Sequence, residues 1–226
     1  MLVYHGSYTL INEIDLEKCR PYTDFGKGFY VTKYKHHAEN WAKKSGGQHH
    51  TDGYVTVFNY IDSSFTEHIC KKKYFNGYTE EWLDFIVNNR NEESVEETHG
   101  FDIIEGPVAN DKVQNKLQYY LTGKISKNDF IKELTYHEET HQICFCTFAS
   151  LQALKYIDRD LTVWIEQTSE NILNKIVKEK NIDADLASDL FFSSKTFSDI
   201  TDKKLEHYKQ EWQNIYEILQ KELDNR

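Results

Sequence analysis

Strand-like segments occur only in the first two thirds of this chain, and this division constrains its fold more than any other feature. Runs of β-branched and aromatic residues end before residue 158, whereas the apolar residues after it recur only at helical spacing. The sequence therefore predicts an α+β domain over residues 1–157 and an all-α extension over residues 158–226. Because no low-complexity linker separates them, we expect the extension to pack on the first domain.

The first domain alternates predicted strands with predicted helices. Apolar and β-branched runs indicate the strands, and apolar residues at helical spacing after N-cap residues such as Ser126 indicate the helices. A Gly-Gly and His-rich segment, residues 45–53, is predicted to be a loop. We expect strands at 2–6, 28–32, 54–61, 101–104 and 142–147, and helices at 34–44, 80–89, 111–121, 126–134 and 150–157.

Charge and hydropathy exclude two classes of partner. The chain carries 27 basic and 37 acidic side chains, a net charge of −10, so non-specific binding to nucleic acid is not expected. No segment approaches the roughly 18 consecutive apolar residues of a membrane helix. Residues 1–5 lead at once into polar residues instead of a signal sequence. We therefore predict a cytoplasmic protein with no removed leader and no membrane contact.

The cysteines and histidines do not predict a metal site. The four cysteines include no CxxC pair, and buried free thiols are the expected state in a reducing compartment. The pairs His36-His37 and His49-His50 lack the spacing of zinc ligands. We expect no bound metal. The cysteines are Cys19, Cys70, Cys144 and Cys146.

A glycine pair before the second predicted strand does not fit the common phosphate loops. Gly26 and Gly28 flank Lys27, but Val31 stands where a GxGxxG motif needs its third glycine, and no GKS or GKT follows. Neither a dinucleotide-binding Rossmann domain nor a P-loop is predicted. The two glycines instead allow a sharp turn ahead of the strand that carries Tyr30.

Three separated segments carry the strongest functional signal: LVYHGSY at 2–8, FGKGFYVT at 25–32 and HHAENWA at 36–42. In this order they resemble the front half of the ADP-ribosyltransferase fold, in its His-Tyr-Glu, poly(ADP-ribose)-polymerase-like branch. Trp41 stands eleven positions after Tyr30, as the second aromatic residue of that branch does. Residues 1–157 also resemble a bacterial domain-of-unknown-function family of the same clan, through RPYTDFGKGFYVT, DIIEGPVAND and HQICFCT.

The resemblance implies an ADP-ribosyltransferase-like split β-sandwich that uses NAD⁺ as a substrate. It implies that His5, assisted by Ser7, hydrogen-bonds the adenosine ribose, and that Tyr30 and Trp41 stack on the nicotinamide ring. Gly6, which has no Cβ, would let the backbone pair with the carboxamide. The cofactor-binding set is therefore His5, Gly6, Ser7, Gly28, Tyr30 and Trp41.

The third motif departs from the family. The catalytic glutamate of the family aligns with Gln142, so the catalytic set here is His5, Tyr30 and Gln142. A glutamine keeps the hydrogen bond to the ribose 2′-hydroxyl but loses the charge that stabilises the developing cation. Glu138 and Glu139 lie just upstream as alternative carboxylates, or as solvated loop charges.

A second departure and a simpler interpretation remain. Ala38 replaces a serine that contacts the carboxamide in the polymerases, unless the neighbouring His37 takes its place. Each motif residue also has a purely structural interpretation: His5 as a hydrogen-bonded histidine at a strand end, the glycines as a turn, and Tyr30 and Trp41 as core aromatics. The order and spacing of the motifs together favour the functional interpretation.

The predicted function is that of a bacterial NAD-dependent mono-ADP-ribosyltransferase, toxin-like in class, which transfers ADP-ribose to a macromolecular acceptor. Because the chain is acidic, the acceptor is predicted to be a protein rather than a nucleic acid. The alternatives are a catalytically weak NAD or ADP-ribose binding module that acts through protein interaction, and an NAD glycohydrolase. The segment 191–223 resembles a small helical domain of unknown function, interpreted as a buttress, a lid, a partner-docking surface or an inhibitor of the transferase, intrinsic or cognate.

Overall fold

The protein has a mixed α/β architecture in this computed structural model, which describes residues 1–62, 69–90, 99–109, 113, 119–120, 122–134 and 140–225. Its strands are β1 (Leu2–Ser7), β2 (Phe29–Val31), β3 (Tyr54–Tyr60), β4 (Lys72–Tyr74), β5 (Ile103–Gly106), β6 (Gln142–Phe145) and β7 (Leu154–Asp160). Its α-helices are α1 (Lys35–His49), α3 (Glu80–Asn89), α5 (Lys127–Leu134), α6 (Phe148–Leu151), α7 (Thr162–Lys180), α8 (Ala184–Phe192), α9 (Lys195–Thr201) and α10 (Trp212–Asp224). Short 3₁₀ helices lie at Leu16–Lys18, Lys203–Leu205 and His207–Lys209.

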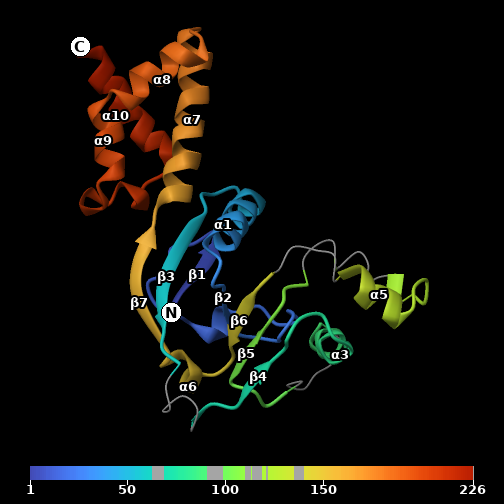
Figure 1. The fold of residues 1–226 in the computed structure, drawn as a ribbon. Helices are drawn as coiled ribbons and strands as arrows, with labels where there is room; N and C mark the ends of the chain where they lie inside the picture. The colour runs from blue at the N-terminus through green and yellow to red at the C-terminus, as the bar shows by residue number, and fades with distance from the viewer. Residues whose placement is uncertain are drawn as a thin grey trace. The chain divides into compact units, whose positions relative to one another are not determined.

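The strands form two sheets, with the orders β1-β3-β7 and β2-β6-β5-β4 (Figure 1). Within the second sheet, β6 is antiparallel to both β2 and β5, whereas β4 runs parallel to β5. A single bridge joins β1 to the end of β2: Tyr4 and Thr32 exchange backbone hydrogen bonds of 2.8 and 2.9 Å. This bridge fixes the position of His5 relative to Tyr30.

The chain divides into two compact units. The first comprises Met1–His5, Ile11–Ala38 and Thr56–Asp158. The second comprises Gly6–Leu10, Glu39–Val55 and Arg159–Arg226.

Both faces of the four-stranded sheet in the first unit are buried, because side chains alternate between the faces of a strand. On one face, Ile104 and Cys144 pack against Trp82 of α3 and Phe130 of α5. On the other face, Phe29, Ile103, Ile143 and Phe145 pack against Val3 and Phe58. Tyr30 lies on the first of these faces, among the residues that pack against α3 and α5.

The second unit is built around α7, with α8, α9 and α10 beside it (Figure 1). Asp183 and Ser194 begin α8 and α9 as N-caps, accepting from the backbone N–H groups of Leu186 and Phe197. The helices predicted after residue 158 are confirmed from α7 onward. None of the described helices is long and apolar enough to cross a membrane. The buried core is Leu161, Trp164, Ile172, Ile176, Ala187, Phe191, Ile200, Tyr208, Ile215, Tyr216 and Leu219.

The prediction of a helix over residues 150–157 is wrong for most of that range. A capping box at Thr147 begins a one-turn helix, α6, which ends at Leu151, and the chain then enters β7. β7 is an edge strand of the first sheet, and its pairing overrides the local helical pattern. The boundary predicted between residues 157 and 158 falls inside this strand.

Other predicted elements shift rather than disappear. α1 continues through Gly46 and Gly47, where a loop was expected, and ends at His49, and the next residue, His50, is in the left-handed conformation (φ 56°). β5 begins two residues later than predicted, and β4, three residues long, carries too little pattern to be expected. The helix predicted over 80–89 is confirmed, as is that over 126–134 with Ser126 as its cap. Most of the helix predicted over 111–121 lies outside the described residues.

All four cysteines are free, as predicted, but the prediction that they are buried holds for only two of them. Cys70 and Cys144 are buried, and Cys19 and Cys146 are half-buried.

Candidate functional site

His5 lies near the end of β1, and its protonation state follows from its contacts. Its Nδ1 lies 2.6 Å from the carbonyl oxygen of Tyr30, and its ring stacks on Phe29 at 4.2 Å. Because a carbonyl only accepts, Nδ1 carries the proton. Burial lowers the pKa of His5 to about 4, so the ring is neutral at pH 7. Nε2 is therefore a hydrogen-bond acceptor, and no described residue donates to it.

Acid is expected to destabilise the protein through His5. The folded pKa, about 4, lies below the unfolded value of 6.5, so the unfolded chain binds more protons between these values. The contribution of neutral His5 to stability is therefore fully present above about pH 6.5 and is lost as the pH drops towards 4. Between about pH 7.5 and pH 5 we expect wild type to lose about 2 kcal/mol more than His5→Gln. Urea unfolding of both proteins at each pH measures this difference.

Two results would contradict that expectation: equal losses in wild type and His5→Gln, or an NMR titration of the His5 ring near its ordinary pKa. His207→Gln, a substitution of a histidine outside both sheets, is the matched control.

The Tyr30 side chain is held by its hydroxyl group in the turn that precedes β2. The hydroxyl oxygen accepts from the backbone N–H of Phe25 at 2.9 Å and donates to the carbonyl of Gly26 at 2.9 Å. The hydroxyl of Thr23 lies 2.7 Å away. Burial raises the pKa of Tyr30, so the phenol stays protonated and keeps this donor. The tyrosine ring is therefore fixed against residues 23–26.

The turn depends on Gly26, whose φ of +78° favours glycine. Gly28, predicted to bind the cofactor, has a structural role here. A Cβ at Gly28 would lie 2.4 Å from Cys144 Sγ and 2.7 Å from the Phe145 carbonyl oxygen. Its lack of a side chain thus allows the close approach of β2 to β6.

Gln142, predicted to be catalytic, begins β6 opposite Gly106 and is buried. Its Nε2 donates to Asp24 Oδ2 at 2.7 Å and to the carbonyl of Pro107 at 3.1 Å. Both donor hydrogens of the amide are therefore used inside the protein. Its acceptor, Oε1, has no partner among the described residues. Gln142 and Tyr30 point to the same face of the sheet, whereas the His5 ring stacks on Phe29, which faces the other side.

Asp24 is the residue that the sequence analysis missed. One carboxylate oxygen accepts from the guanidinium of Arg90, through Nε at 2.9 Å and through a second, shorter contact. The other accepts from Gln142 and from the backbone N–H of Ala109 at 2.8 Å. Asn89 donates to the carbonyl of Asp24. The carboxylate is 95% buried, and a local pattern could not reveal it because its partners lie far away in sequence.

The remaining predicted residues belong to the second unit. Gly6 is buried, and Ser7 Oγ accepts from the N–H of Thr9, which forms a local turn. Trp41 on α1 is 43% exposed, and the Lys44 ammonium lies 5.7 Å from its ring centroid. The stacking of Trp41 on nicotinamide stays a prediction, as do the roles of Gly6 and Ser7.

The alternatives to Gln142 and to the missing serine complete the set of predicted residues. Glu138 and Glu139 lie outside the described residues. Ala38, which replaces the serine of the polymerases, is buried, and its neighbour His37 is half-buried with its ring 5.1 Å from that of Tyr34.

Comparison with known proteins gives one match. A family model described as a protein of unknown function (DUF3990) matches residues 1–156. No curated protein and no solved structure matches the chain. The match ends inside β7 and before α7 begins.

Proposed function

We propose that this chain, which belongs to the DUF3990 family of proteins of unknown function, is an NAD-dependent mono-ADP-ribosyltransferase. In the proposed reaction the bond between the ribose C1′ and the nicotinamide nitrogen breaks, and nicotinamide leaves. A nucleophile of a protein acceptor forms the new bond to C1′ and gives up its proton to solvent.

The proposal rests on one observation about His5 and Gln142. In each side chain the polar hydrogens are bound by other groups of the protein, and one acceptor atom remains available to a ligand. The backbone carbonyl of Tyr30 holds the Nδ1 proton of His5, which makes Nε2 an acceptor. Asp24 and Pro107 hold the amide hydrogens of Gln142, which leaves Oε1 as an acceptor. Ribose hydroxyl groups are donors that suit both atoms. Because Gln142 and the His5 ring lie on opposite faces of the sheet, they would contact different riboses of the dinucleotide, and neither side chain would have to reorient on binding.

Tyr30 supports the same proposal through the rigidity of its ring. Its hydroxyl group is fixed by Phe25 and Gly26, so the ring loses little conformational entropy when a flat ligand stacks on it. An aromatic contact of this kind contributes on the order of 1 kcal/mol beyond the burial of area.

Asp24 modifies what Gln142 can do. The amide donates to a carboxylate, which polarises the amide and makes Oε1 a stronger acceptor than that of an isolated glutamine. Arg90 offsets much of the carboxylate charge, so little of it is available to stabilise a cation at C1′. We therefore propose a slow transferase that binds NAD⁺ well.

The neutral amide also favours a second candidate, an NAD or ADP-ribose binding module without turnover. Removal of one charged stabilising group from a transition state costs a few kcal/mol, or about 10²–10³ in rate. A binding module would retain ribose recognition by His5 and Gln142 and would lack measurable cleavage.

We expect His5→Phe to weaken NAD⁺ binding by about tenfold or more, because one hydrogen bond to the ribose is lost. Phenylalanine keeps the packing against Phe29, so the fold should persist. Isothermal titration of the full chain with NAD⁺ measures the change. His207→Phe, in the helical extension, is the control and should bind as wild type does. Equal affinity of His5→Phe and wild type would contradict the proposal, as would a wild-type chain that does not bind NAD⁺.

Labelled NAD⁺ separates the activities. Purified chain and host lysate are incubated with NAD⁺ labelled in the adenylate, and nicotinamide release and label incorporation into protein are followed separately. Release with incorporation supports the transferase. Release alone indicates a glycohydrolase, and binding without release indicates the binding module.

A further inference from the structure

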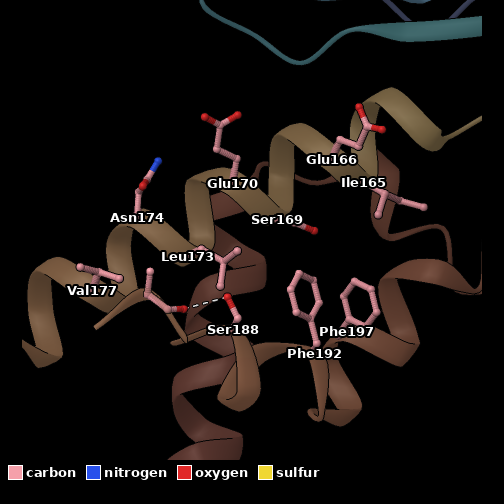
Figure 2. A pocket seen from close by; sticks show the side chains of 11 residues that line it. Ile165, Glu166, Ser169, Glu170, Leu173, Asn174, Val177, Ser188, Phe192 and Phe197 are labelled. Carbon is pink, nitrogen blue, oxygen red and sulfur yellow. Dashed lines mark hydrogen bonds between the residues drawn. The ribbon is translucent and has the colours of Figure 1, made fainter. Parts of the chain in front are cut away.

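The helical extension contains an open cavity of about 510 Å³ between α7 on one side and α8 and α9 on the other (Figure 2). It lies entirely within the second unit and beyond the residues matched by the family. The residues of the proposed NAD site are not part of it.

The walls of the cavity are two helical rows with a regular period. On α7 the row is Ile165, Ser169, Leu173 and Val177, and on α8 it is Ala184, Ser188 and Phe192. The residues of each row are four positions apart, and rows with this spacing form the ridges by which one helix packs against another. At 1.5 Å per residue, the α7 row is about 18 Å long, or about three helical turns. This elongated shape fits a helix better than a compact small molecule.

Apolar side chains line the ends of the cavity, and small side chains lie near its middle. Phe192 is 48% exposed although its ring packs edge-on against Phe197 at 4.9 Å. In Figure 2 Leu173 lies above Ser188, and the side chains of Leu173 and Phe192 both point into the space between the helices. Ser169 and Ser188 at the centre allow the backbone of a docked helix to approach closely. Exposed aromatic surface of this kind marks interaction sites.

One polar atom of the wall is unsatisfied. Ser169 is 92% buried, and its hydroxyl has no hydrogen-bond partner in the described structure. Ser188, by contrast, donates to the carbonyl of Ala184 at 2.8 Å. A buried hydroxyl without a partner is rare, and rotation of the Ser169 side chain towards the groove would let a small polar side chain of a docked helix satisfy it.

The charge along the cavity has one sign. Glu166 and Glu170 are the charged residues of the lining, and Figure 2 shows both on the outer side of α7. Glu166 is paired with Lys43 at 2.7 Å, and the charge of Lys43 also acts on Glu170, so these three residues together leave one negative charge along this edge of α7. A segment that docks in the cavity would therefore be complementary if it carried positive charge.

We propose that the groove between α7 and α8 is the docking site for an amphipathic helix of a partner protein. The face of this helix that enters the groove is apolar, with a small polar residue at its centre that meets Ser169. Lysine or arginine residues follow along the flank that meets Glu170. The helical extension thus recruits a basic helical partner independently of NAD⁺.

A designed peptide tests this proposal. The probe is a fluorescein-labelled helical peptide of about 18 residues. Leucines form its apolar stripe, serine stands at the centre of the stripe, and lysines occupy one flank. A second peptide has glutamates in place of the lysines, and a third has a proline at the centre. By fluorescence anisotropy with the full chain, we expect the lysine peptide to bind about tenfold or more tightly than either control.

Variants of the chain locate the binding. Glu170→Lys is expected to reverse the preference, so that the glutamate peptide binds more tightly than the lysine peptide. Leu173→Asp is expected to abolish binding of both peptides. Phe192→Ser is expected to weaken binding about tenfold, and it provides the test if Leu173→Asp does not fold. Leu205→Asp, a substitution of an exposed leucine outside the groove, is the control and should bind as wild type does. Circular dichroism checks that each variant is folded.

Three outcomes overturn the proposal. The first is binding that ignores the charge of the peptide, and the second is binding that survives Leu173→Asp and Phe192→Ser in folded chains. The third is a wild-type dimer in sedimentation that Leu173→Asp dissociates, because the groove would then hold a second copy of this chain. Binding of the peptide with or without NAD⁺ should be equal, so this test does not depend on the proposed enzymatic function.

Discussion

Replacement of Asp24 by alanine is expected to lower the free energy of unfolding of the first unit by about 3–5 kcal/mol. The buried carboxylate accepts from Arg90, Gln142 and the N–H of Ala109. Without it, the guanidinium of Arg90 lacks a counter-charge while its side chain remains only 21% exposed. Urea unfolding followed by the fluorescence of Trp82, with the other tryptophans replaced by phenylalanine, measures the loss.

The matched control is a surface pair in the same part of the chain. Glu17 and Lys27 lie 3.0 Å apart, and the Glu17 side chain is 77% exposed. Glu17→Ala should change the stability by less than about 1 kcal/mol, because exposed pairs are screened by water. If Asp24→Ala were as mild as Glu17→Ala, the buried network would not hold the turn at residues 23–26.

Gln142→Glu is expected to destabilise the chain by about 2–4 kcal/mol near pH 7. The substitution replaces an amide that donates to Asp24 and Pro107 with a carboxylate that can only accept. Two carboxylates then face each other where 2.7 Å now separates a donor from an acceptor. Gln142→Met removes the same hydrogen bonds without adding charge, and should cost about 1–2 kcal/mol.

The pH dependence of Gln142→Glu identifies the charge repulsion. A carboxyl group beside Asp24 has a raised pKa in the folded state, so the folded chain binds more protons than the unfolded chain above about pH 4.3. The destabilisation therefore grows as the pH rises from about 4.3 to 7. The loss in Gln142→Met should not vary in this way. Parallel pH profiles for the two variants would show that Gln142 and Asp24 are not in contact in solution.

A double variant links stability to the proposed chemistry. Asp24→Asn removes one of the two facing charges, so its combination with Gln142→Glu should recover about 1–2 kcal/mol relative to the sum of the single changes. In the transferase proposal, the new carboxylate then stands where ADP-ribosyltransferases have their catalytic glutamate. If the transferase proposal is right, NAD⁺ cleavage by the double variant should exceed that of wild type by about tenfold or more. Recovery of stability without a gain in cleavage would favour the binding module.

Local motifs predicted much of the architecture and the candidate residues. Periodicity identified the helix at 80–89, the strands that became β2, β3 and β6, and the helices after residue 158. These predictions succeeded because burial of an apolar face imposes a period on the sequence within one element. The resemblance to ADP-ribosyltransferases rests on motifs of the same short range, and it identified His5, Tyr30 and Gln142 as residues to examine.

The errors occurred where distant pairing outweighs local pattern. Residues 154–157 look helical, but their hydrogen bonds with β3 make them part of an edge strand. β4 has a polar sequence, and it is a strand because β5 lies beside it. The propensity of a few residues amounts to tenths of a kcal/mol, so a row of backbone hydrogen bonds overrides it.

The sequence by itself determined the segments that form β1, β2, β3, β5 and β6, the helical extension from α7 onward, and the side chains that carry the motif. Only the tertiary structure decided what those side chains do. Gln142 and Asp24 are separated by 118 residues, and their hydrogen bond engages the amide donor of Gln142 inside the protein. The Tyr30 carbonyl, 25 residues from His5, determines which nitrogen of His5 accepts. The physical reason is that hydrogen bonds and buried charges act over a few ångströms in space, and no local pattern records which distant residues the fold brings within that range.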